Sequence, residues 1–485
     1  MASNLEISRR DLALAAVGGA VSLMTGCGPG RTPSKSTKSS RFPQGFKWGA
    51  ASSAFQTEGS LTSDGRGPSI WDLFSSEPKH IIDGSNASVA TDSYVRYQDD
   101  VALIADAGLS SYRFSTSWSR VLPSGFGAIN EKGLDFYDRF VDALLAHKID
   151  PYLTLFHWDL PQALFKQGGW RSRETPKRLA DFAELIARRL GDRVKNFVVL
   201  NEAAVHTVFG HVLGIHAPGQ RDANLLGPVT HHQNLGQGLA IAALRATRPK
   251  AQIGTTLALQ PIRPEGGALE FWNLLPETIF DEMWNGAYLD PLLKGVYPWA
   301  AHRFVDPFIK QDDMAAIHQD VDFVGVNYYS PTYVKLDSSN PGFIGKADPP
   351  AGAKLDAFGR EIDPRALGQV LHRLRVEYGN PNVIITENGV SDHLSNTRKS
   401  VIDDKFRVDY LSQHLNAVKS AIEQGSKVNG YFVWTLVDNW EWNWGYTAKF
   451  GLCAMDRVTG HRQAKNSMSW IRAVAQTNSL PTLVG

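Results

Sequence analysis

The sequence predicts an α/β protein with the architecture of a (β/α)8 TIM barrel in one domain. Eight short apolar runs recur along the chain, and segments with helical periodicity separate them. Two of the apolar stretches close on a glutamate, VVLNE on Glu202 and VIITE on Glu387. Eight strand–helix repeats close a parallel sheet into a barrel, and the catalytic side chains of such barrels lie at the carboxyl ends of the strands.

The eight predicted strands are rich in Val, Ile, Leu and aromatic residues and show little polar alternation. Strands of this kind are buried on both faces, as in parallel sheets covered by helices. In chain order they are FKWGAA (46–51), SSYRFS (110–115), PYLTLFHW (151–158), VVLNE (198–202), AQIGTTLAL (251–259), DFVGVNYY (322–329), NVIITENG (382–389) and GYFVWTL (430–436).

Two segments between these runs show the three-and-four spacing of an amphipathic helix. Apolar residues recur from Leu134 to Leu145 and again from Val408 to Ile422, each set on one helix face. Strands that alternate with helices predict right-handed crossovers and a parallel sheet. An open doubly wound sheet is the alternative, but no predicted strand precedes a glycine-rich phosphate loop.

Charge and composition indicate the class of partner. The 485 residues include 50 Lys and Arg against 49 Asp and Glu, interspersed along the chain, so nothing indicates a nucleic-acid-binding surface. Removing residues 1–40, with five basic and two acidic residues, leaves 45 and 47, a net charge of −2. The 13 tryptophans suit either a core or a site that stacks on sugar rings. We therefore expect neutral small molecules as partners.

The first 27 residues are predicted to be an export signal. Arg9 and Arg10 precede an uncharged run of 14 residues, 12–25, which is too short to span a bilayer but suits the apolar core of a signal peptide. The paired arginines resemble a twin-arginine signal. Met24-Thr25-Gly26-Cys27 resembles a lipoprotein processing site, with Cys27 as the lipidated residue. We expect export to the periplasm or cell envelope, with a lipid anchor as the one membrane contact.

Residues 28–40 are rich in Gly, Ser, Thr, Lys and Pro and are predicted to form a flexible linker. Residues 41–485 are the predicted barrel domain. Cys453 is the only cysteine besides Cys27. If Cys27 is lipidated or removed, no intramolecular disulfide can form, so the fold depends on its core.

Ordered motifs between Phe42 and Trp470 resemble glycoside hydrolase family 1. The motifs are FPQGFKWGAASSAFQTEG, YRFSTSWSRVLPSG, TLFHWDLPQ, LNEA, HAPG, DFVGVNYYSP, IITENG and WTLVDNWEWNWGYTAKFGL. Each motif alone is weak or moderate evidence, but the whole set in this order has a very low chance rate. The resemblance implies a catalytic barrel that hydrolyses β-glycosides with retention and needs no cofactor, and we expect a β-glucosidase that removes terminal non-reducing β-D-glucosyl residues by double displacement.

The two glutamates take unequal roles by this resemblance. Retention needs a carboxylate that attacks the anomeric carbon and a carboxylic acid that protonates the leaving oxygen, about 5–5.5 Å apart. The resemblance makes Glu387 the nucleophile and Glu202 the acid/base, with Arg113 and Tyr329 beside the nucleophile. An ionised Glu387 about 5 Å away would raise the cost of ionising Glu202 by roughly 3 kcal/mol, enough by itself to keep Glu202 protonated. The alternative for each glutamate is a capping or salt-bridged residue at a strand end.

A second set of polar and aromatic residues is expected to bind the sugar. Polar side chains at strand ends suit sugar hydroxyls, and the resemblance directs Asn201 to the 2-hydroxyl, where hydrogen bonds strengthen in the transition state. His157 has a satisfied core histidine as its alternative. Trp434 is expected to stack under the ring and Trp442 to offer an indole donor, whereas Trp440 and Trp444 are expected to serve packing. The predicted substrate-binding residues are Gln56, His157, Trp158, Asn201, Asn327, Trp434, Glu441, Trp442 and Phe450.

The chain departs from the family pattern at three places without losing a catalytic group. Ala203 replaces the usual Pro, Trp440 the usual Phe and Ser93 the usual His. Glu441 would repel a phosphate, which favours unphosphorylated sugars, and the presence of Glu202 argues against the thioglucosidase branch.

Several alternatives stay open. A β-galactosidase, a β-fucosidase or a transglycosylase would use the same residues, and a non-catalytic sugar-binding protein would be expected to lack one glutamate. The histidines His211, His216, His231 and His232 have no acidic or cysteine partner at ligand spacing, so no metal site is expected.

Overall fold

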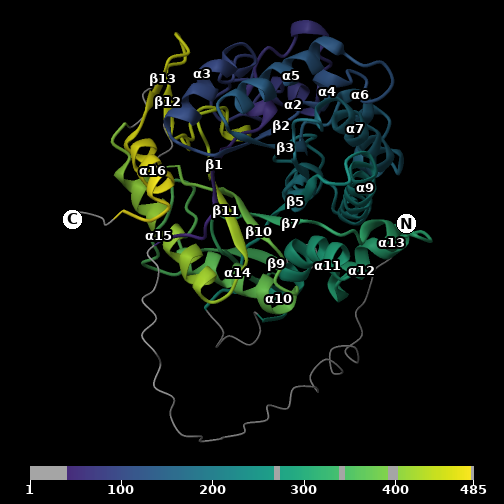
Figure 1. Ribbon diagram of the computed structural model, residues 1–485. Helices are drawn as coiled ribbons and strands as arrows, with labels where there is room; N and C mark the ends of the chain where they lie inside the picture. The colour runs from purple at the N-terminus through teal and green to yellow at the C-terminus, as the bar shows by residue number, and fades with distance from the viewer. Residues whose placement is uncertain (1–40, 267–273, 338–343, 392–401, 482–485) are drawn as a thin grey trace, which may run out of the picture. The chain divides into compact units, whose positions relative to one another are not determined.

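Eight parallel strands close into a barrel in the computed structural model of the chain (Figure 1). Each predicted strand forms one of them, and each pairs with the next in chain order until the last meets the first, which confirms the predicted (β/α)8 TIM barrel. The strands are β1 (Lys47–Ala51), β2 (Ser111–Ser115), β3 (Asp150–Phe156), β4 (Asn196–Asn201), β5 (Gln252–Ala258), β7 (Phe323–Asn327), β10 (Val383–Asn388) and β11 (Val428–Trp434).

The structure describes residues 41–266, 274–337, 344–391 and 402–481. The predicted signal at 1–27 and linker at 28–40 lie outside these residues. Within the described part, no helix is long and apolar enough to cross a membrane.

Helices surround the strands and supply the crossovers between them (Figure 1). Both predicted amphipathic helices are confirmed: Leu134 to Leu145 lies in α5, and Val408 to Ile422 in α15. The main helices are α3 (Ser93–Asp106), α5 (Glu131–Ala146), α7 (Glu174–Leu190), α9 (Leu226–Thr247), α14 (Pro364–Glu377), α15 (Lys405–Glu423) and α16 (Asn466–Thr477), and between β5 and β7 lie α10 (Leu274–Asp281), α11 (Ala287–Leu293), α12 (Trp299–Val305) and α13 (Asp313–Ile317).

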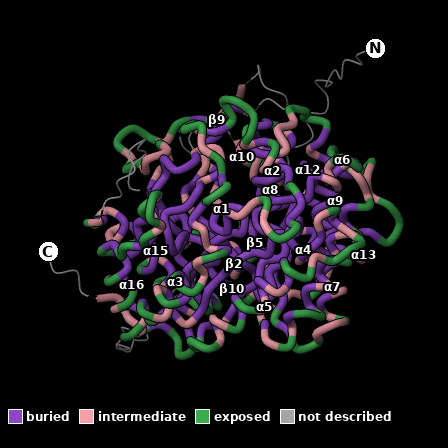
Figure 2. Tube along the Cα trace, turned by 90° about the horizontal axis from the view of Figure 1, so that it is seen from above, coloured by how far each residue is buried: buried purple, intermediate pink, exposed green. Residues whose placement is uncertain are grey.

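The strands have apolar side chains on both faces, which explains why they form continuous apolar runs in the sequence. Leu153 and Leu155 of β3 belong to the large cluster shared with the helices. Tyr152, which directly precedes Leu153, points into the barrel, where its ring lies 4.9 Å from that of Phe432 and 6.2 Å from that of Phe323. Around Tyr152 the barrel interior is therefore a packed core. Figure 2 shows the buried residues concentrated around the strands.

Short elements follow the carboxyl ends of the strands and were not predicted. A three-stranded sheet pairs β6 (Ile262–Pro264), β8 (Thr332–Leu336) and β9 (Ile344–Ala347), and β12 (Cys453–Met455) pairs with β13 (Arg462–Ala464). The short helical turns are α1 (Ala54–Thr57), η1 (Ser63–Gly65), α2 (Ile70–Ser76), α4 (Trp118–Val121), α6 (Gln162–Lys166), η2 (Gly169–Arg171), α8 (Ala203–Thr207), η3 (Val208–Val212), η4 (Ala223–Leu225), η6 (Glu282–Gly286), η7 (Asp306–Phe308) and η9 (Trp442–Trp444).

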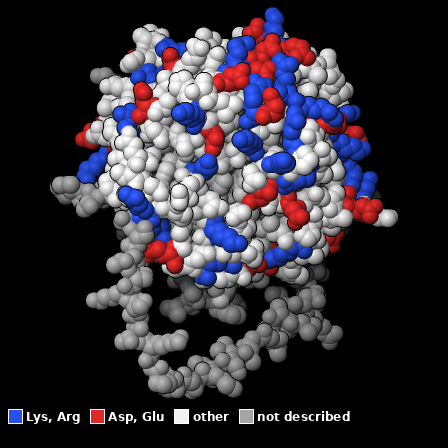
Figure 3. Space-filling model, viewed as in Figure 1, with Lys and Arg blue, Asp and Glu red and all other residues white. Residues whose placement is uncertain are grey.

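Acidic and basic side chains are interspersed on the face of the molecule that Figure 3 shows. Between α5 and α7, for example, Arg189 pairs with Asp135 and Asp138. Such mixing agrees with the balanced charge of the sequence and contrasts with the single-sign surface of a nucleic-acid-binding protein.

Candidate active site

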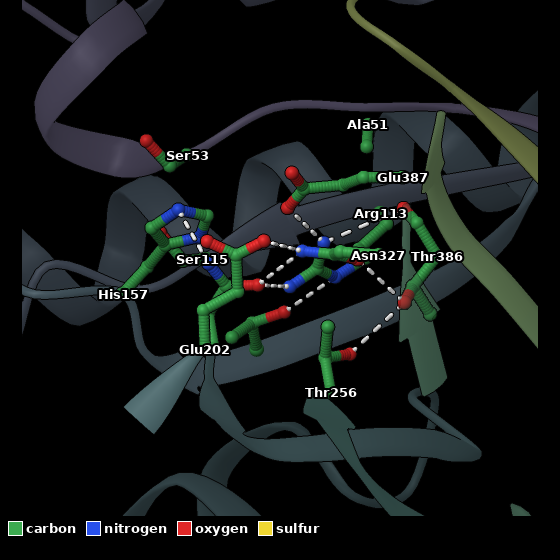
Figure 4. Close-up of polar contacts among 12 residues, drawn as sticks. Ala51, Ser53, Arg113, Ser115, His157, Glu202, Thr256, Asn327, Thr386 and Glu387 are labelled. Carbon is green, nitrogen blue, oxygen red and sulfur yellow. Dashed lines mark hydrogen bonds and ion pairs between the residues drawn. The ribbon is translucent and has the colours of Figure 1, made fainter. Parts of the chain in front are cut away.

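The two predicted catalytic glutamates lie at the carboxyl ends of two barrel strands (Figure 4). Glu202 follows β4 directly, and Glu387 is the fifth residue of β10. Asn327, the last residue of β7, pairs in register with Glu387. Both residues are buried: 6% of the surface of Glu202 and 3% of that of Glu387 is exposed. Parallel strands with their carboxyl ends at one edge thus bring together residues that are 185 positions apart in the sequence.

Glu387 has a strong donor on each carboxylate oxygen. Arg113 Nη1 donates to Oε1 over 2.6 Å, and the Tyr329 hydroxyl donates to Oε2 over 2.7 Å. Burial raises the pKa of Glu387, while the charge of Arg113 and the hydrogen bond from Tyr329 oppose that rise. Burial and the charge of Glu387 raise the pKa of Tyr329 well above its usual value, so this phenol stays a donor. Together these contacts favour an ionised Glu387.

Glu202 has weaker support for a negative charge. Its Oε1 accepts one hydrogen bond, from Asn327 Nδ2 over 2.8 Å. Burial, and after it the charge of Glu387, raises the pKa of Glu202 to about 8. The sequence-based expectation was that the charge of Glu387 would be enough by itself to keep Glu202 protonated. The structure instead makes desolvation the larger cause, because the carboxyl group is enclosed by barrel and loop residues.

Asn201 connects the surroundings of the two glutamates. Its Oδ1 accepts from Arg113 Nη2 over 2.6 Å and from Asn327 Nδ2 over 3.2 Å. Its Nδ2 lies 3.0 Å from His157 Nε2. Since the amide nitrogen can only donate, His157 Nε2 must accept, and the ring proton is on Nδ1.

His157 therefore presents an unused donor to the site. Burial and the neighbouring charge of Arg113 lower its pKa well below the usual value, which keeps the ring neutral. Its Nδ1 is buried and has no hydrogen-bond partner among the residues that the structure describes. A buried N–H without a partner is costly, so this donor is suited to a ligand hydroxyl. The interpretation of His157 as a satisfied core histidine accounts for only one of its two nitrogens.

A layer of threonines inside the barrel supports this network and was not predicted. Thr154 Oγ1 accepts from Arg113 Nε over 3.1 Å, and Thr386 Oγ1 donates to Asn327 Oδ1 over 2.8 Å. Gly325 leaves room for this layer, because a Cβ at that position would lie 2.5 Å from the hydroxyl oxygen of Thr256. The Thr256 hydroxyl in turn donates to that of Thr386. The threonines were not recognised because an isolated Thr in an apolar run is typical of any strand.

Gln56 and Glu441 form a second polar contact near the two glutamates. Gln56, in α1 after β1, donates from Nε2 to Glu441 Oε2 over 3.1 Å. Burial raises the pKa of Glu441 to about 8, with a smaller contribution from the charge of Glu387. Asn439 is a further residue that sequence reasoning missed: its Oδ1 accepts from Gln56, and its buried Nδ2 has no partner in the described part of the chain.

Aromatic residues enclose the polar groups. The rings of Trp158 and Trp442 lie 4.7 Å apart, and Trp434 stacks with the His157 ring at 6.0 Å and 24°. Phe450 stacks with Phe358 at 5.7 Å and 16°. All four predicted aromatic residues, Trp158, Trp434, Trp442 and Phe450, are thus buried next to the predicted polar set.

Trp440 and Trp444 pack as predicted. Trp440 is fully buried against Phe55 and Trp71, and its indole nitrogen donates to Ser85. Trp444 is half-buried edge-on to Phe358 at 4.9 Å. Trp440 replaces a Phe of the family pattern without leaving its nitrogen unpaired.

The backbone is left-handed at three of the site residues. The φ angles are 74° at Trp158, 48° at Glu202 and 51° at Trp442. Such conformations are unfavourable for residues with side chains and are concentrated at functional sites. Ala203, which replaces the usual Pro, begins α8 directly after Glu202.

The third departure, Ser93, has hydrogen-bond partners of its own. Its hydroxyl donates to Asp100 over 2.6 Å, and Asp100 also accepts from Arg462. The substitution therefore leaves a satisfied buried network.

Three of the other four histidines named from the sequence have structural partners, whereas the buried His216 Nδ1 has no hydrogen-bond partner among the residues that the structure describes. His231 contacts Asp313 and Tyr297, His232 the carbonyl of Trp170, and His211 that of His206. Among the described residues, no group of three or more His, Cys, Asp or Glu side chains is arranged to hold a metal ion.

Comparisons with known proteins agree with this geometry. Residues 38–480 match glycosyl hydrolase family 1. The chain is 38% identical to β-glucosidase A of Thermotoga maritima over 445 residues, which cover 91% of this chain and 99% of that protein. It is 40% identical to a bifunctional β-D-glucosidase/β-D-fucosidase of Bifidobacterium breve over 459 residues, 89% of this chain and 97% of the relative.

Solved structures show the same similarity. A family 1 β-glucosidase from Thermotoga maritima superposes with a TM-score of 0.87 at 36% identity and covers 92% of this chain and 100% of its own. The complex of the Thermotoga maritima β-glucosidase with deoxynojirimycin gives a TM-score of 0.85 at 36% identity, over 91% of this chain and 100% of that one. The chain is therefore a glycoside hydrolase and belongs to glycosyl hydrolase family 1.

Proposed function

We propose that the protein hydrolyses terminal β-D-glucosides by double displacement, with Glu387 as the nucleophile and Glu202 as the acid/base. One observation carries this proposal: the two buried carboxyl groups have opposite environments. Glu387 is bound by a guanidinium and a phenol, whereas Glu202 has one amide donor and a pKa raised to about 8. Carboxyl groups with pKa values held apart are suited to separate nucleophile and acid roles.

In the first step, a carboxylate oxygen of Glu387 attacks the anomeric carbon while Glu202 gives its proton to the leaving oxygen. The glycosidic C–O bond breaks, a glucosyl ester forms on Glu387 and the alcohol departs. Tyr329 and Arg113 hold the attacking carboxylate in position. Asn201, held by Arg113 and Asn327, would bond the 2-hydroxyl, where interactions strengthen as positive charge develops on the ring.

In the second step, the charge of Glu387 has been lost to the ester. One of the causes that raise the pKa of Glu202 disappears, so the now ionised Glu202 can take a proton from water. The resulting hydroxide oxygen bonds to the anomeric carbon, and the Glu387 carboxylate leaves. Two inversions give net retention.

Glucose is the proposed sugar because the relatives are named β-glucosidases and because donors for several hydroxyls are available. Within the described part of the chain, His157 Nδ1 and Asn439 Nδ2 are buried donors without a partner, and Gln56 and Glu441 form a hydrogen-bonded polar pair. β-Fucoside hydrolysis is the second candidate, since the Bifidobacterium breve relative is named bifunctional. Activity on β-galactosides, or transfer of the glucosyl group to an alcohol, would use the same groups.

We further propose that the protein is exported by the twin-arginine route and anchored through a lipid on Cys27. This rests on the paired Arg9 and Arg10, the 14-residue uncharged run at 12–25 and the processing motif that ends at Cys27. Mass spectrometry of the mature N-terminus tests it. We expect a lipidated Cys27 as the first residue, and the Cys27→Ser chain should lack the lipid; an unmodified Cys27 in the wild-type chain would contradict the proposal.

The decisive test of the reaction is proton NMR of the first-formed sugar, recorded on a panel of aryl β-glucosides, β-galactosides and β-fucosides. We expect β-glucose to appear first and to mutarotate afterwards, with the glucoside cleaved fastest. α-Glucose as the first product would contradict the double displacement. Faster cleavage of another sugar would contradict the proposed specificity and leave the mechanism standing.

The acid role of Glu202 is tested by the leaving group. Glu202→Ala should slow hydrolysis of a methyl or alkyl β-glucoside far more than hydrolysis of a dinitrophenyl β-glucoside, whose leaving group needs no proton. Equal losses for both substrates would contradict that role. Glu77→Ala, at an exposed carboxyl in the same chain, is the matched control and should change neither rate.

A further inference from the structure

Arg360 is fixed beside Tyr329 by a short turn between β9 and α14. Asp356 accepts from Arg360 Nε over 2.8 Å and forms an ion pair with Nη2 at 2.7 Å. The other oxygen of Asp356 accepts from the backbone N–H groups of Phe358 and Arg360. Leu355 and Glu361 close the turn with a β-bridge. The guanidinium is thus held in one orientation, although 32% of the side chain is exposed.

The guanidinium lies over two aromatic rings. Its central carbon is 5.3 Å from the ring centroid of Tyr329 and 4.8 Å from that of Phe358. Both distances are within the range of a cation–π interaction. Phe358 in turn stacks on Phe450, and the Tyr329 hydroxyl donates to Glu387 Oε2 over 2.7 Å. A chain of contacts therefore runs from Asp356 through Arg360 and Tyr329 to the proposed nucleophile.

We propose that Arg360 is a positioning residue that acts on Glu387 through Tyr329: its cation over the phenol ring strengthens the hydrogen bond that Tyr329 donates to the nucleophile. The proposal rests on the proposed function of Glu387. Arg360 lies outside the motifs by which the sequence resembles its family, and no role in the reaction was predicted for it.

The physical argument follows the charge. A cation over an aromatic face draws electron density from the ring, so the phenolic O–H becomes a better donor to an anion. A better donor favours the ionised form of Glu387, which is the form that attacks, and also favours its departure as a carboxylate in the second step. Removing the cation should raise the pH at which Glu387 becomes ionised.

Other charged and titratable groups surround Glu387 and Tyr329 and must be kept constant. Arg113 belongs to β2, Asp356 to the turn itself and Tyr410 to α15. His157, Glu202 and Glu441 follow β3, β4 and β11, respectively. The charge of Arg360 also limits the rise in the pKa of Glu441. In addition, Arg360 limits the rise that burial causes in the pKa of Tyr410, and Tyr410 raises the pKa of Arg360. A test must therefore separate an effect that passes through Tyr329 from a direct field on the whole site.

The test compares pH profiles of kcat/KM for dinitrophenyl β-glucoside, in which the acid limb reports ionisation of the free enzyme's nucleophile. Arg360→Met keeps an unbranched side chain over the rings without the charge, and Arg360→Lys keeps the charge. Arg365→Met is the matched control, because Arg365 pairs with Asp363 but its side chain is 87% exposed.

We expect Arg360→Met to move the acid limb upward by about 0.5 pH unit. Arg360→Lys should restore part of that shift, and Arg365→Met should leave the limb in place. In a Tyr329→Phe background the Arg360→Met shift should be lost, since no phenolic hydrogen bond is left to strengthen. An unmoved limb in Arg360→Met, even with lowered thermal stability, would overturn the proposal and assign Arg360 a structural role.

An equal shift with and without the Tyr329 hydroxyl would also overturn the proposal, because the effect would then be a direct field. These outcomes leave the proposed function intact as long as the variants still release β-glucose first. Loss of retaining hydrolysis from the wild-type enzyme would instead contradict the proposed function itself.

Discussion

Replacing Glu202 with Gln should stabilise the protein and remove the proton that Glu202 is proposed to donate. A carboxyl group whose pKa is raised in the folded state binds its proton more tightly there than in the unfolded chain. The unfolded chain therefore ionises first as the pH rises, and the folded state loses stability through that interval. Gln keeps the oxygen that accepts from Asn327 Nδ2 and has no charge to desolvate.

The magnitude follows from the pKa of Glu202, which rises from 4.5 to about 8. Each unit corresponds to about 1.4 kcal/mol. The penalty is absent below pH 4.5, reaches about 3 kcal/mol at pH 7 and levels off near 5 kcal/mol above pH 8. Glu202→Gln removes this penalty, so the advantage of the variant over the wild type should grow with pH in the same way.

Urea unfolding followed by tryptophan fluorescence at pH 5, 6, 7 and 8 measures the difference. Glu77→Gln, at an exposed carboxyl, is the control and should differ from the wild type by less than about 0.5 kcal/mol at every pH. A Glu202→Gln variant whose stability relative to the wild type does not change with pH would refute the reasoning. A variant that is less stable at pH 8 than the wild type would refute it as well.

Three further predictions concern the groups around the site. Arg113→Met leaves the buried Glu387 carboxylate without its ion pair and should lower kcat/KM for dinitrophenyl β-glucoside by at least about 100-fold, with destabilisation of about 3–5 kcal/mol in urea; unchanged kinetics would exclude Arg113 from the site. Arg120→Met likewise leaves the buried Glu58 without its 2.7 Å ion pair and should cost about 3–5 kcal/mol of unfolding free energy, and a loss below 1 kcal/mol would contradict the pairing. Cys453 is fully buried and burial raises its thiol pKa to about 12, so iodoacetamide at pH 8 should label its peptide only after unfolding; rapid labelling of the native protein, read by mass spectrometry, would contradict that burial.

The barrel could be predicted because its strands are buried on both faces. Residues such as Leu153, which faces the helices, and Tyr152, which faces the barrel interior, are both apolar, so each strand forms a continuous run in the sequence. The helices α5 and α15 bury one face each and keep the periodicity that identifies them. The strands β6, β8 and β9 are three to five residues long, too short for such a pattern.

That Glu202 and Glu387 lie close together could be predicted because each lies at the end of a strand, and parallel strands end at the same edge. The residues that hold the side chains around these two glutamates in place could not be predicted. Thr154, Thr386 and Asn439 act through hydrogen bonds to residues far away in the sequence, such as the bond from Arg113 to Thr154, which spans 41 positions. Thr and Asn in or after a strand are common for other reasons, so their position carried no signal.

The origin of the Glu202 pKa also lies beyond the sequence. The charge of Glu387 can be anticipated from the motif, but the degree of burial depends on how loops from several strands cover the carboxyl group. Burial is the larger cause. The contact between Arg360 and Tyr329 is of the same kind, because a turn 31 residues further along the chain brings the guanidinium over the ring.

The central claim is that Glu387 attacks the sugar, and trapping the glucosyl ester tests it most directly. A 2-deoxy-2-fluoro-β-glucoside with an activated leaving group forms the ester but hydrolyses slowly, because the fluorine destabilises the positively charged transition state. Mass spectrometry of peptides from the inactivated enzyme should place one fluoroglucosyl group on Glu387, and Glu387→Gln should not be labelled. A label on Glu202 or on any other residue, or turnover without a covalent adduct, would contradict the account.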